Sequence, residues 1–346
     1  MTAFQRLTMA DIAQLAGVSK TTASMVLNGQ AEQYRIAAST VARVRQVAAE
    51  HHFQPSASAR LLRSRRSGTL GLVVPELTNF AHALLAQALE PLCRDAGFQL
   101  FVVSSNDQAD METKAVEQLL ARQVDGLMLV PCTNNAKLYA KWAKRLPLVL
   151  VDRRVIDSNL PFVVSNAEEQ VFTLIEHTLA QGVTEIAYFG GQMLLSPSID
   201  RLAGYQRAWQ ARQLPVNQAL IWQRDYQNQS GYAMMNECYT LLGRYPEAIF
   251  TASISLLEGV LAFMNEHDHF NNAPQHLLSF DDHRLLDCMP LPINTVVQDS
   301  AQLAAQSLQR ILALLAGEAV ESSWVAAHIN WRQKVELAVA AGKIPV

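Results

Sequence analysis

Residues 7–28, LTMADIAQLAGVSKTTASMVLN, hold the pattern that decides the fold of the N-terminal part. Thr8 is a suitable N-cap for a first helix, and Gly17 follows at a point where a helix end often needs positive φ. Ser19 can cap a second helix that ends at Asn28. Helix, glycine turn and helix can place the second helix in the DNA major groove, although an ordinary helical hairpin also fits the looser pattern. Apolar residues at helical spacing mark the first helix: Met9, Ile12, Ala13 and Ala16.

Charge is divided unevenly along the chain. Residues 1–68 hold nine lysines and arginines against three acidic residues, a net charge of +6. The remainder holds 19 basic and 28 acidic residues, a net charge of −9. A basic head on an acidic body indicates that only the head binds a polyanion such as DNA.

Length and composition predict two or three domains without a membrane segment. Half of the 346 residues are hydrophobic, 17% are charged, and no run approaches 18 consecutive apolar residues. The N-terminus lacks the apolar centre of a secretory signal, so we expect a cytoplasmic protein. The four cysteines are far apart and lack CxxC spacing, which favours reduced thiols over a metal site.

A third helix and a linker complete the predicted head. Ser39 or Thr40 can cap a helix that runs to about His52. Pro55 interrupts the helical register, because proline restricts the residue before it. Residues 56–63 are too few for a stable isolated helix and would form one only on a partner. The sequence therefore predicts a DNA-binding domain at residues 1–54 and a hinge helix with linker at residues 55–68.

From residue 69 onward, apolar stretches of strand length alternate with amphipathic helical stretches. This alternation is typical of parallel sheets covered by helices on both faces. Two successive series of strand and helix predict an α/β domain made of two Rossmann-like lobes. The predicted strands are residues 70–74, 99–103, 126–130, 148–151, 185–189, 247–251, 276–280 and about 324–329.

No catalytic pattern is found in the sequence. It contains no G-x-S-x-G, no P-loop and no H-E-x-x-H, so we do not expect an enzyme. Gly190 and Gly191 lack the rest of a dinucleotide fingerprint, and a tight turn explains them. Residues 267–269, HDH, are better explained by a solvated helix end than by a metal site. Asp281 and Asp282 are adjacent in a strand end and should point in different directions.

The ends of the predicted strands favour a ligand site. In open α/β sheets, ligands bind beyond the carboxyl ends of the strands. The segments that follow the strands are rich in carboxylates, arginines, amides and small alcohols, which are groups that pair with hydroxyls. Phe80 and Tyr226 could supply flat apolar faces. This mixture suits a sugar.

Residues 11–28 match, almost position by position, the D-(V/I)-A-x-x-A-G-V-S-x-x-T-(V/A)-S-x-V-(L/I)-N pattern of the LacI/GalR family. The chain resembles this family from residue 8 to about residue 330. The resemblance implies a helix-turn-helix head and two lobes, within residues 69–346, arranged as in a periplasmic sugar-binding protein. By analogy, lobe one comprises residues 69–165 and 298–322, and lobe two comprises residues 166–297 and 323–336.

The resemblance also implies which residues contact DNA. Lys20, Thr21 and Met25 occupy the positions that read base edges from the second helix. Leu62, seven residues after Pro55, matches the leucine that wedges a base step open when two hinge helices pair in the minor groove. The full set of implied DNA contacts is Thr8, Ser19, Lys20, Thr21, Thr22, Ser24, Met25, Asn28, Ser56, Ala59 and Leu62.

For the effector, Arg201 matches the arginine of the family's arginine-xx-glycine segment, and Asp281 matches the first aspartate of its G-(F/Y)-D-(D/N) segment. Asp152 matches another cleft carboxylate. Two departures are that Ser279 replaces the glycine before Phe280, and that Ser253 stands where the family commonly has N-D. Further ligand contacts are expected at Asn79, Phe80, Ser196, Ser198, Tyr226, Ser253 and Gln298.

Within the family, the chain most resembles the fructose and sucrose operon repressors. The markers are AGVSKTTAS, QYR at residues 33–35, RQVDG at 122–126, and FGGQ at 189–192. This implies a homodimeric repressor that binds double-stranded operator DNA and a small sugar effector, with no cofactor and no membrane contact. A dual activator and repressor that senses a phosphorylated fructose is the alternative.

The predicted cleft chemistry favours a neutral sugar, fructose or sucrose, over fructose 1-phosphate. Two carboxylates accept hydrogen bonds from adjacent hydroxyls, and one arginine donates two in a fixed fork. A phosphate would be repelled by Asp152 and Asp281 unless a further cation joined. Arg153 is the obvious candidate for that cation.

Overall fold

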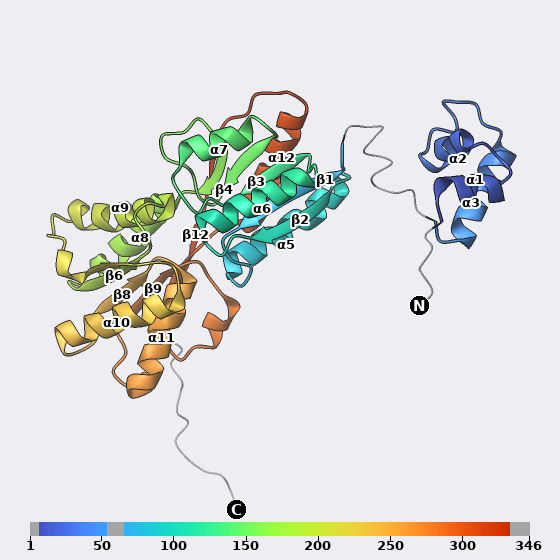
Figure 1. Ribbon diagram of the computed structural model, residues 1–346. Helices are drawn as coiled ribbons and strands as arrows, with labels where there is room; N and C mark the ends of the chain where they lie inside the picture. The colour runs from blue at the N-terminus through green and yellow to red at the C-terminus, as the bar shows by residue number, and fades with distance from the viewer. Residues whose placement is uncertain (1–6, 54–65, 333–346) are drawn as a thin grey trace, which may run out of the picture. The chain divides into compact units, whose positions relative to one another are not determined.

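The computed structural model of the protein describes residues 7–53 and 66–332. The chain divides between Gly68 and Thr69 into a helical head and a larger α/β body, and each is described by itself (Figure 1). None of the helices in these ranges is both long enough and apolar enough to cross a membrane. The expected hinge helix at residues 56–63, with Ser56, Ala59 and Leu62, lies outside the described residues.

The head contains helices α1 (Met9–Leu15), α2 (Lys20–Leu27) and α3 (Ala38–Glu50). Thr8 and Asp11 form a capping box on α1, because each side chain accepts a hydrogen bond from the backbone N–H of the other. Gly17 has a φ of +62°. The Ser19 hydroxyl accepts the backbone N–H of Thr22 at 3.0 Å. The two predicted caps and the glycine turn are therefore confirmed.

Helix α3 begins earlier than predicted. Ala37 is its N-cap and makes no side-chain hydrogen bond to the helix. The Ala37 carbonyl accepts the N–H of Val41 at 3.1 Å, which places Ser39 and Thr40 inside the first turn and makes the predicted cap wrong. The core that joins the three helices consists of Ala13, Ala16, Ala23, Val26, Ala31 and Val44.

Lobe one of the body is built on a parallel sheet with strand order β11-β5-β4-β3-β1-β2 (Figure 1). Helices α5 (Phe80–Asp95) and α12 (Ser300–Leu315) cover one face, and α6 (Ala109–Ala121) and α7 (Ala136–Ala143) cover the other. Side chains of β1 alternate between the two faces, as a strand buried on both sides requires. The strands are β1 (Thr69–Val74), β2 (Gln99–Ser104), β3 (Gly126–Leu129), β4 (Leu148–Val151), β5 (Phe162–Ser165) and β11 (Ser323–Val325).

Lobe two repeats this arrangement with strand order β12-β10-β9-β8-β6-β7, in which only β12 is antiparallel to its neighbour. Helices α8 (Ala167–Ala180) and α9 (Ser196–Ala211) pack together, and so do α10 (Asn228–Leu242) and α11 (Ile254–Asp268). Two short 3-10 helices complete it, at Gln218–Leu220 and Arg284–Cys288. The strands are β6 (Ile186–Gly190), β7 (Ile221–Gln223), β8 (Ala248–Thr251), β9 (His276–Phe280), β10 (Ile293–Val297) and β12 (His328–Asn330).

One predicted boundary between the lobes is wrong. Residues 323–336 were predicted to belong to lobe two, with one strand at about 324–329, but β11 (Ser323–Val325) pairs with β5 in lobe one. Only β12 pairs with β10 in lobe two. Asn166 explains the break, because its N–H donates to the Val325 carbonyl and its side chain accepts the N–H of Ala327. The strand therefore stops where the chain crosses between the lobes.

Helices α10 and α11 approach each other closely at glycines. A Cβ added to Gly259 would lie 1.9 Å from the Asn228 carbonyl oxygen and 2.5 Å from the Tyr232 nitrogen, both backbone atoms of α10. We expect Gly259→Ala to lower the unfolding free energy by about 1–3 kcal/mol, because the helices must separate. Urea denaturation measures this, with Asn265→Ala on the exposed side of α11 as the control. Equal midpoints for Gly259→Ala and the wild type would contradict the close approach.

Candidate functional site

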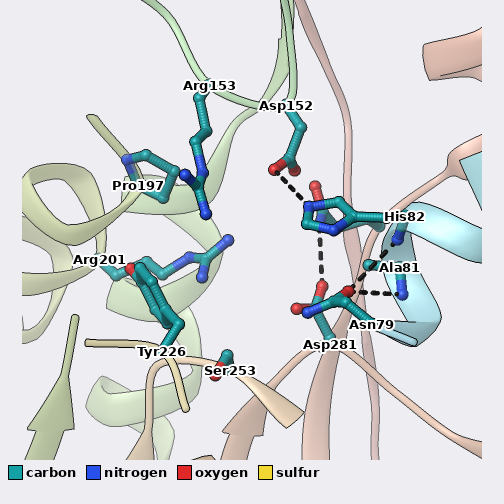
Figure 2. A pocket seen from close by; sticks show the side chains of 11 residues that line it. Asn79, Ala81, His82, Asp152, Arg153, Pro197, Arg201, Tyr226, Ser253 and Asp281 are labelled. Carbon is teal, nitrogen blue, oxygen red and sulfur yellow. Dashed lines mark hydrogen bonds and ion pairs between the residues drawn. The ribbon is translucent and has the colours of Figure 1, made fainter. Parts of the chain in front are cut away.

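The carboxyl-terminal ends of the two parallel sheets face one another across a cleft between the lobes. A pocket with an open volume of about 350 Å³ lies there (Figure 2). It takes residues from the N-terminal ends of α5, α9 and α11 and from the segments that follow β4, β7, β9 and β10. Its lining consists of Asn79, Ala81, His82, Asp152, Arg153, Pro197, Arg201, Tyr226, Ser253, Asp281 and Gln298.

Seven of the ten predicted ligand residues line this pocket: Asn79, Asp152, Arg201, Tyr226, Ser253, Asp281 and Gln298. Phe80, Ser196 and Ser198 do not line it. The Phe80 ring packs against His283, with ring centroids 4.1 Å apart. The Ser196 hydroxyl accepts the backbone N–H of Arg154, and the Ser198 hydroxyl bonds the Tyr226 hydroxyl at 2.8 Å. These three predicted positions therefore act on neighbours of the pocket.

Asp152 and Asp281 both have left-handed backbone conformations, with φ of +63° and +70°. Aspartate tolerates this region better than most residues, but the conformation still costs free energy. Each residue directly follows a buried strand, β4 or β9. Two sheets thus end in the same strained turn with a carboxylate, and both carboxylates line the pocket.

Asp281 is only 7% exposed. Burial raises the pKa of its carboxyl to about 6, although the positive charge of Arg201 acts in the opposite direction. The Gln298 amide donates to Asp281 at 2.8 Å, while its oxygen accepts the hydroxyl hydrogen of Ser165. Because Ser165 ends β5 of lobe one, this chain of bonds connects the buried carboxylate of lobe two to lobe one.

His82 was not predicted from the sequence. Its Nδ1 lies 3.1 Å from the Glu76 carbonyl, which only accepts, so Nδ1 carries the proton. Burial lowers the pKa of the imidazole, and its Nε2 lies 3.9 Å from Asp152. A neutral His82 therefore presents a hydrogen-bond acceptor on the Asp152 side of the pocket.

Two guanidinium groups lie on the opposite side. In Figure 2, Arg153, Arg201 and Tyr226 lie across the pocket from Asp152, His82, Asn79 and Asp281. Arg153 donates to Asp107 at 2.7 Å and to the Pro131 carbonyl at 3.0 Å. Arg201 donates to the Ala252 carbonyl, and its Nε is buried without a hydrogen-bond partner among the described residues.

Two helix caps add neutral groups to the lining. The Asn79 oxygen accepts the N–H groups of Ala81 and His82, which leaves its amide nitrogen free to donate. The Ser253 oxygen accepts the N–H of Leu256 at 3.2 Å, which leaves its hydroxyl hydrogen free to donate. The pocket thus offers acceptors on one side and donors on the other, an arrangement that several hydroxyls of one small molecule can satisfy.

Gly190, the last residue of β6, and Gly191 after it do not serve the predicted tight turn. Neither has positive φ. A Cβ on Gly191 would lie 2.2 Å from the Tyr226 ring, and one on Gly190 would lie 2.4 Å from the Tyr188 ring. They are glycines because aromatic rings occupy the space of a side chain.

Direct contacts join the lobes beside the pocket. The Arg154 guanidinium makes a two-pronged ion pair with Asp200 of α9, including a bond of 2.8 Å. The Gln227 amide donates to the Glu76 carboxylate. Each bridging residue lies close in sequence to a pocket residue.

The residues considered for a metal site or an acid–base pair have structural partners instead. His267 stacks on Phe263, with ring centroids 5.3 Å apart. Asp282 binds Arg332 and Thr295, so it points away from the pocket that Asp281 lines, as predicted. In the described parts of the chain, no group of three or more His, Cys, Asp or Glu could hold a metal ion.

In the head, the predicted DNA contacts lie along α2, from its N-cap Ser19 to its C-cap Asn28, apart from Thr8, which is exposed at the start of α1. Ser19, Lys20 and Thr21 are exposed, while Thr22, Ser24, Met25 and Asn28 are half-buried. The Asn28 amide donates to the Ser24 carbonyl at 2.7 Å, which closes the end of the helix. The hydroxyls of Ser19 and Thr22 bond each other at 2.8 Å, so both are partly occupied by the cap.

A helix-turn-helix head on a two-lobed body with a hydroxyl-binding cleft defines a DNA-binding sensor of a small polar molecule. Residues 8–56 match the model for bacterial regulatory proteins of the lacI family, and residues 67–320 match that for periplasmic binding proteins and the sugar binding domain of the LacI family. The chain belongs to the LacI family and is a sugar-responsive transcriptional regulator, not an enzyme.

Named relatives agree with the predicted subgroup. The chain is 43% identical to the sucrose operon repressor of Klebsiella pneumoniae, over 92% of this chain and 95% of that protein. It is 32% identical to the fructose operon regulatory protein of Vibrio cholerae, over 87% and 92%. The crystal structure of the Cra transcriptional dual regulator from Pseudomonas putida in complex with fructose 1-phosphate is similar, with a TM-score of 0.72 and 29% identity, over 77% and 99%.

The raised pKa of Asp281 makes stability depend on pH. The folded protein binds this proton more tightly than the unfolded chain, so the group's contribution to stability is lost as pH rises from about 4 to about 6. We expect Asp281→Asn to raise the unfolding free energy by up to about 3 kcal/mol at pH 7.5, and by little at pH 4. Urea denaturation at both values tests this, with exposed Asp95→Asn as the control. The same gain at both pH values would refute the burial argument.

Proposed function

We propose that this regulator represses a carbohydrate utilisation operon and that its effector is a small neutral sugar containing fructose, either fructose or sucrose. The observation that carries the proposal is the opposition of Asp152 and Asp281 to Arg201 across one pocket. Carboxylates accept hydrogen bonds from adjacent hydroxyls, and the Arg201 guanidinium, whose terminal nitrogens point into the pocket in Figure 2, donates to another.

Charge balance supports a neutral ligand. Arg153 is already matched by Asp107 at 2.7 Å, so its charge is not available in full to an anion. Arg201 is then the remaining cation of the lining, and it faces two carboxylates. A phosphate in the pocket would meet more negative than positive charge.

A phosphorylated fructose, sensed by a dual activator and repressor, is the second candidate. The specific observation that favours it is the position of Arg153 and Arg201 on the same side of the pocket, each with its guanidinium carbon 5.9 Å from the centre of the Tyr226 ring. A phosphate placed there would lie away from Asp152 and Asp281. The Pseudomonas putida relative was crystallised with such a ligand.

Calorimetric titration with fructose, sucrose and fructose 1-phosphate distinguishes these effectors. We expect fructose or sucrose to bind, and Arg201→Ala and Asp281→Ala to weaken binding by about tenfold or more, since each removes a hydrogen bond to a charged group. Exposed Arg145→Ala is the matched control and should bind as the wild type does. Binding of the phosphate alone, abolished by Arg153→Ala, would overturn the choice of a neutral sugar.

Effector binding would change operator affinity by changing the arrangement of the two lobes. A ligand shifts an equilibrium only if it binds one arrangement better than the other. The pocket has residues from both lobes, so a sugar can discriminate between arrangements of Asp152 and Asp281. A shift of lobe one would change the spacing of two hinge helices and so their pairing on the operator.

A homodimer is part of this proposal, since two hinge helices must meet in one minor groove of a two-fold operator. One face of α5 supports it, because Leu84, Ala88 and Leu92 form a half-buried apolar stripe. The neighbouring strand β2 is the last in its sheet and exposes Val102. Bound to its operator, such a regulator would act in the cytoplasm.

We assign the recognition of operator bases to the exposed residues at the start of α2. Lysine suits the acceptor atoms of guanine in the major groove, and Lys20 is exposed there. We expect Lys20→Ala to lose about 1–3 kcal/mol of binding free energy on the preferred operator and to relax preference at one base pair. Affinities for a set of operators with single base changes measure this, with Lys114→Ala on the body as the control. Equal weakening on every operator would make Lys20 a phosphate contact instead.

A further inference from the structure

We propose that Phe280 is a positioning residue for effector binding. Its ring stabilises the Arg201 guanidinium where a carboxylate would usually do so, and the terminal N–H groups of the arginine thus stay available to the ligand. This inference rests on the proposed function of the pocket. Phe280 does not line the pocket itself. It is the last residue of β9 and is completely buried.

The contact between the two side chains is unusually close. The guanidinium carbon of Arg201 lies 3.6 Å from the centre of the Phe280 ring. A guanidinium over an aromatic face is attracted by the ring quadrupole, and the attraction is greatest where water is excluded. Arg201 is 5% exposed and Phe280 is 0% exposed, so this contact is desolvated.

Arg201 lacks the usual partner of a buried arginine. Arg153, on the same side of the pocket, has Asp107 at 2.7 Å. For Arg201, no carboxylate oxygen of the described residues lies within 4.0 Å. Its only hydrogen bond among them goes to the Ala252 carbonyl, and its Nε has no acceptor. A carboxylate would have stabilised the charge but would have occupied the terminal N–H groups of Arg201, which point into the pocket in Figure 2.

A second ring flanks the same guanidinium. Tyr226 lies 5.9 Å from it, and its hydroxyl is held by Ser198 at 2.8 Å. Gly191 leaves the space that the Tyr226 ring fills. On the Phe280 side, the Ser279 hydroxyl donates to the Phe280 carbonyl at 3.0 Å and accepts from Thr251 at 2.9 Å. Ser279, which replaces the family's glycine, therefore bonds to the backbone of Phe280, whose ring contacts Arg201.

The experiment replaces Phe280 with phenylalanines carrying one, two or three ring fluorines. Fluorine withdraws charge from the ring face with little change of size, so packing is retained while the attraction for a cation falls. Titration with D-fructose, sucrose and fructose 1-phosphate should show affinity decreasing stepwise, by about tenfold at three fluorines. Phe250, equally buried on the adjacent strand β8 and stacked on Tyr188, is the matched control. The same fluorines there should change affinity by less than about twofold.

A measurement without sugar separates this inference from the proposed function. Fluorination of Phe280 should lower the urea midpoint in the wild-type background but not in Arg201→Met, where no cation lies over the ring. If fluorination lowers the midpoint only when Arg201 is present, and the wild type binds none of the three sugars, the result would support the Arg201 contact and reject the proposed effector. Equal effects of fluorine in both backgrounds, or affinity unchanged along the series while the wild type binds, would overturn the role of Phe280.

Discussion

The constraint on which the body depends is that two parallel sheets direct their carboxyl-terminal ends at one cleft. The loops at those ends carry Asp152, Arg153 and Asp281, and the nearby helix α9 carries Arg201. Arg153, Arg201 and Asp281 are buried there, beside a half-buried Asp152, and each buried charge must be balanced by a group close to it. The solutions differ: a carboxylate for Arg153, an amide for Asp281, and two aromatic rings for Arg201. A polar ligand completes a set of groups that the fold has already desolvated.

Features with local causes could be predicted from the sequence. Thr8, Gly17 and Ser19 act on backbone groups within a few residues, so their roles follow from spacing alone. The alternation of apolar strands and helices predicted both lobes for the same reason. Asp152 and Asp281 were placed at the cleft because a polar residue directly after a buried strand must lie at a carboxyl edge.

Features that depend on distant partners could not be predicted. Nothing near His82 in the sequence indicates that Glu76 and Asp152 would hold it at the pocket. Ser196 and Ser198 were predicted to contact the ligand, but in the structure their hydroxyls bond Arg154 and Tyr226. These contacts join residues far apart in the sequence, so the sequence did not indicate them. The predicted strands also omitted β5, β7 and β10. Residues 324–329 were predicted as one strand, whereas the structure divides them between two sheets.

The bridges between the lobes have a kinetic consequence. Arg154 with Asp200, and Gln227 with Glu76, join the lobes through the protein's own side chains, next to residues of the pocket lining. If a ligand can enter between the lobes only when these bonds are broken, its binding waits for their opening. The observed association rate would then level off at the opening rate as concentration rises, instead of increasing in proportion to it. How fast such a regulator responds to a sudden supply of its effector would thus be limited by two surface contacts, and not by the chemistry of the site.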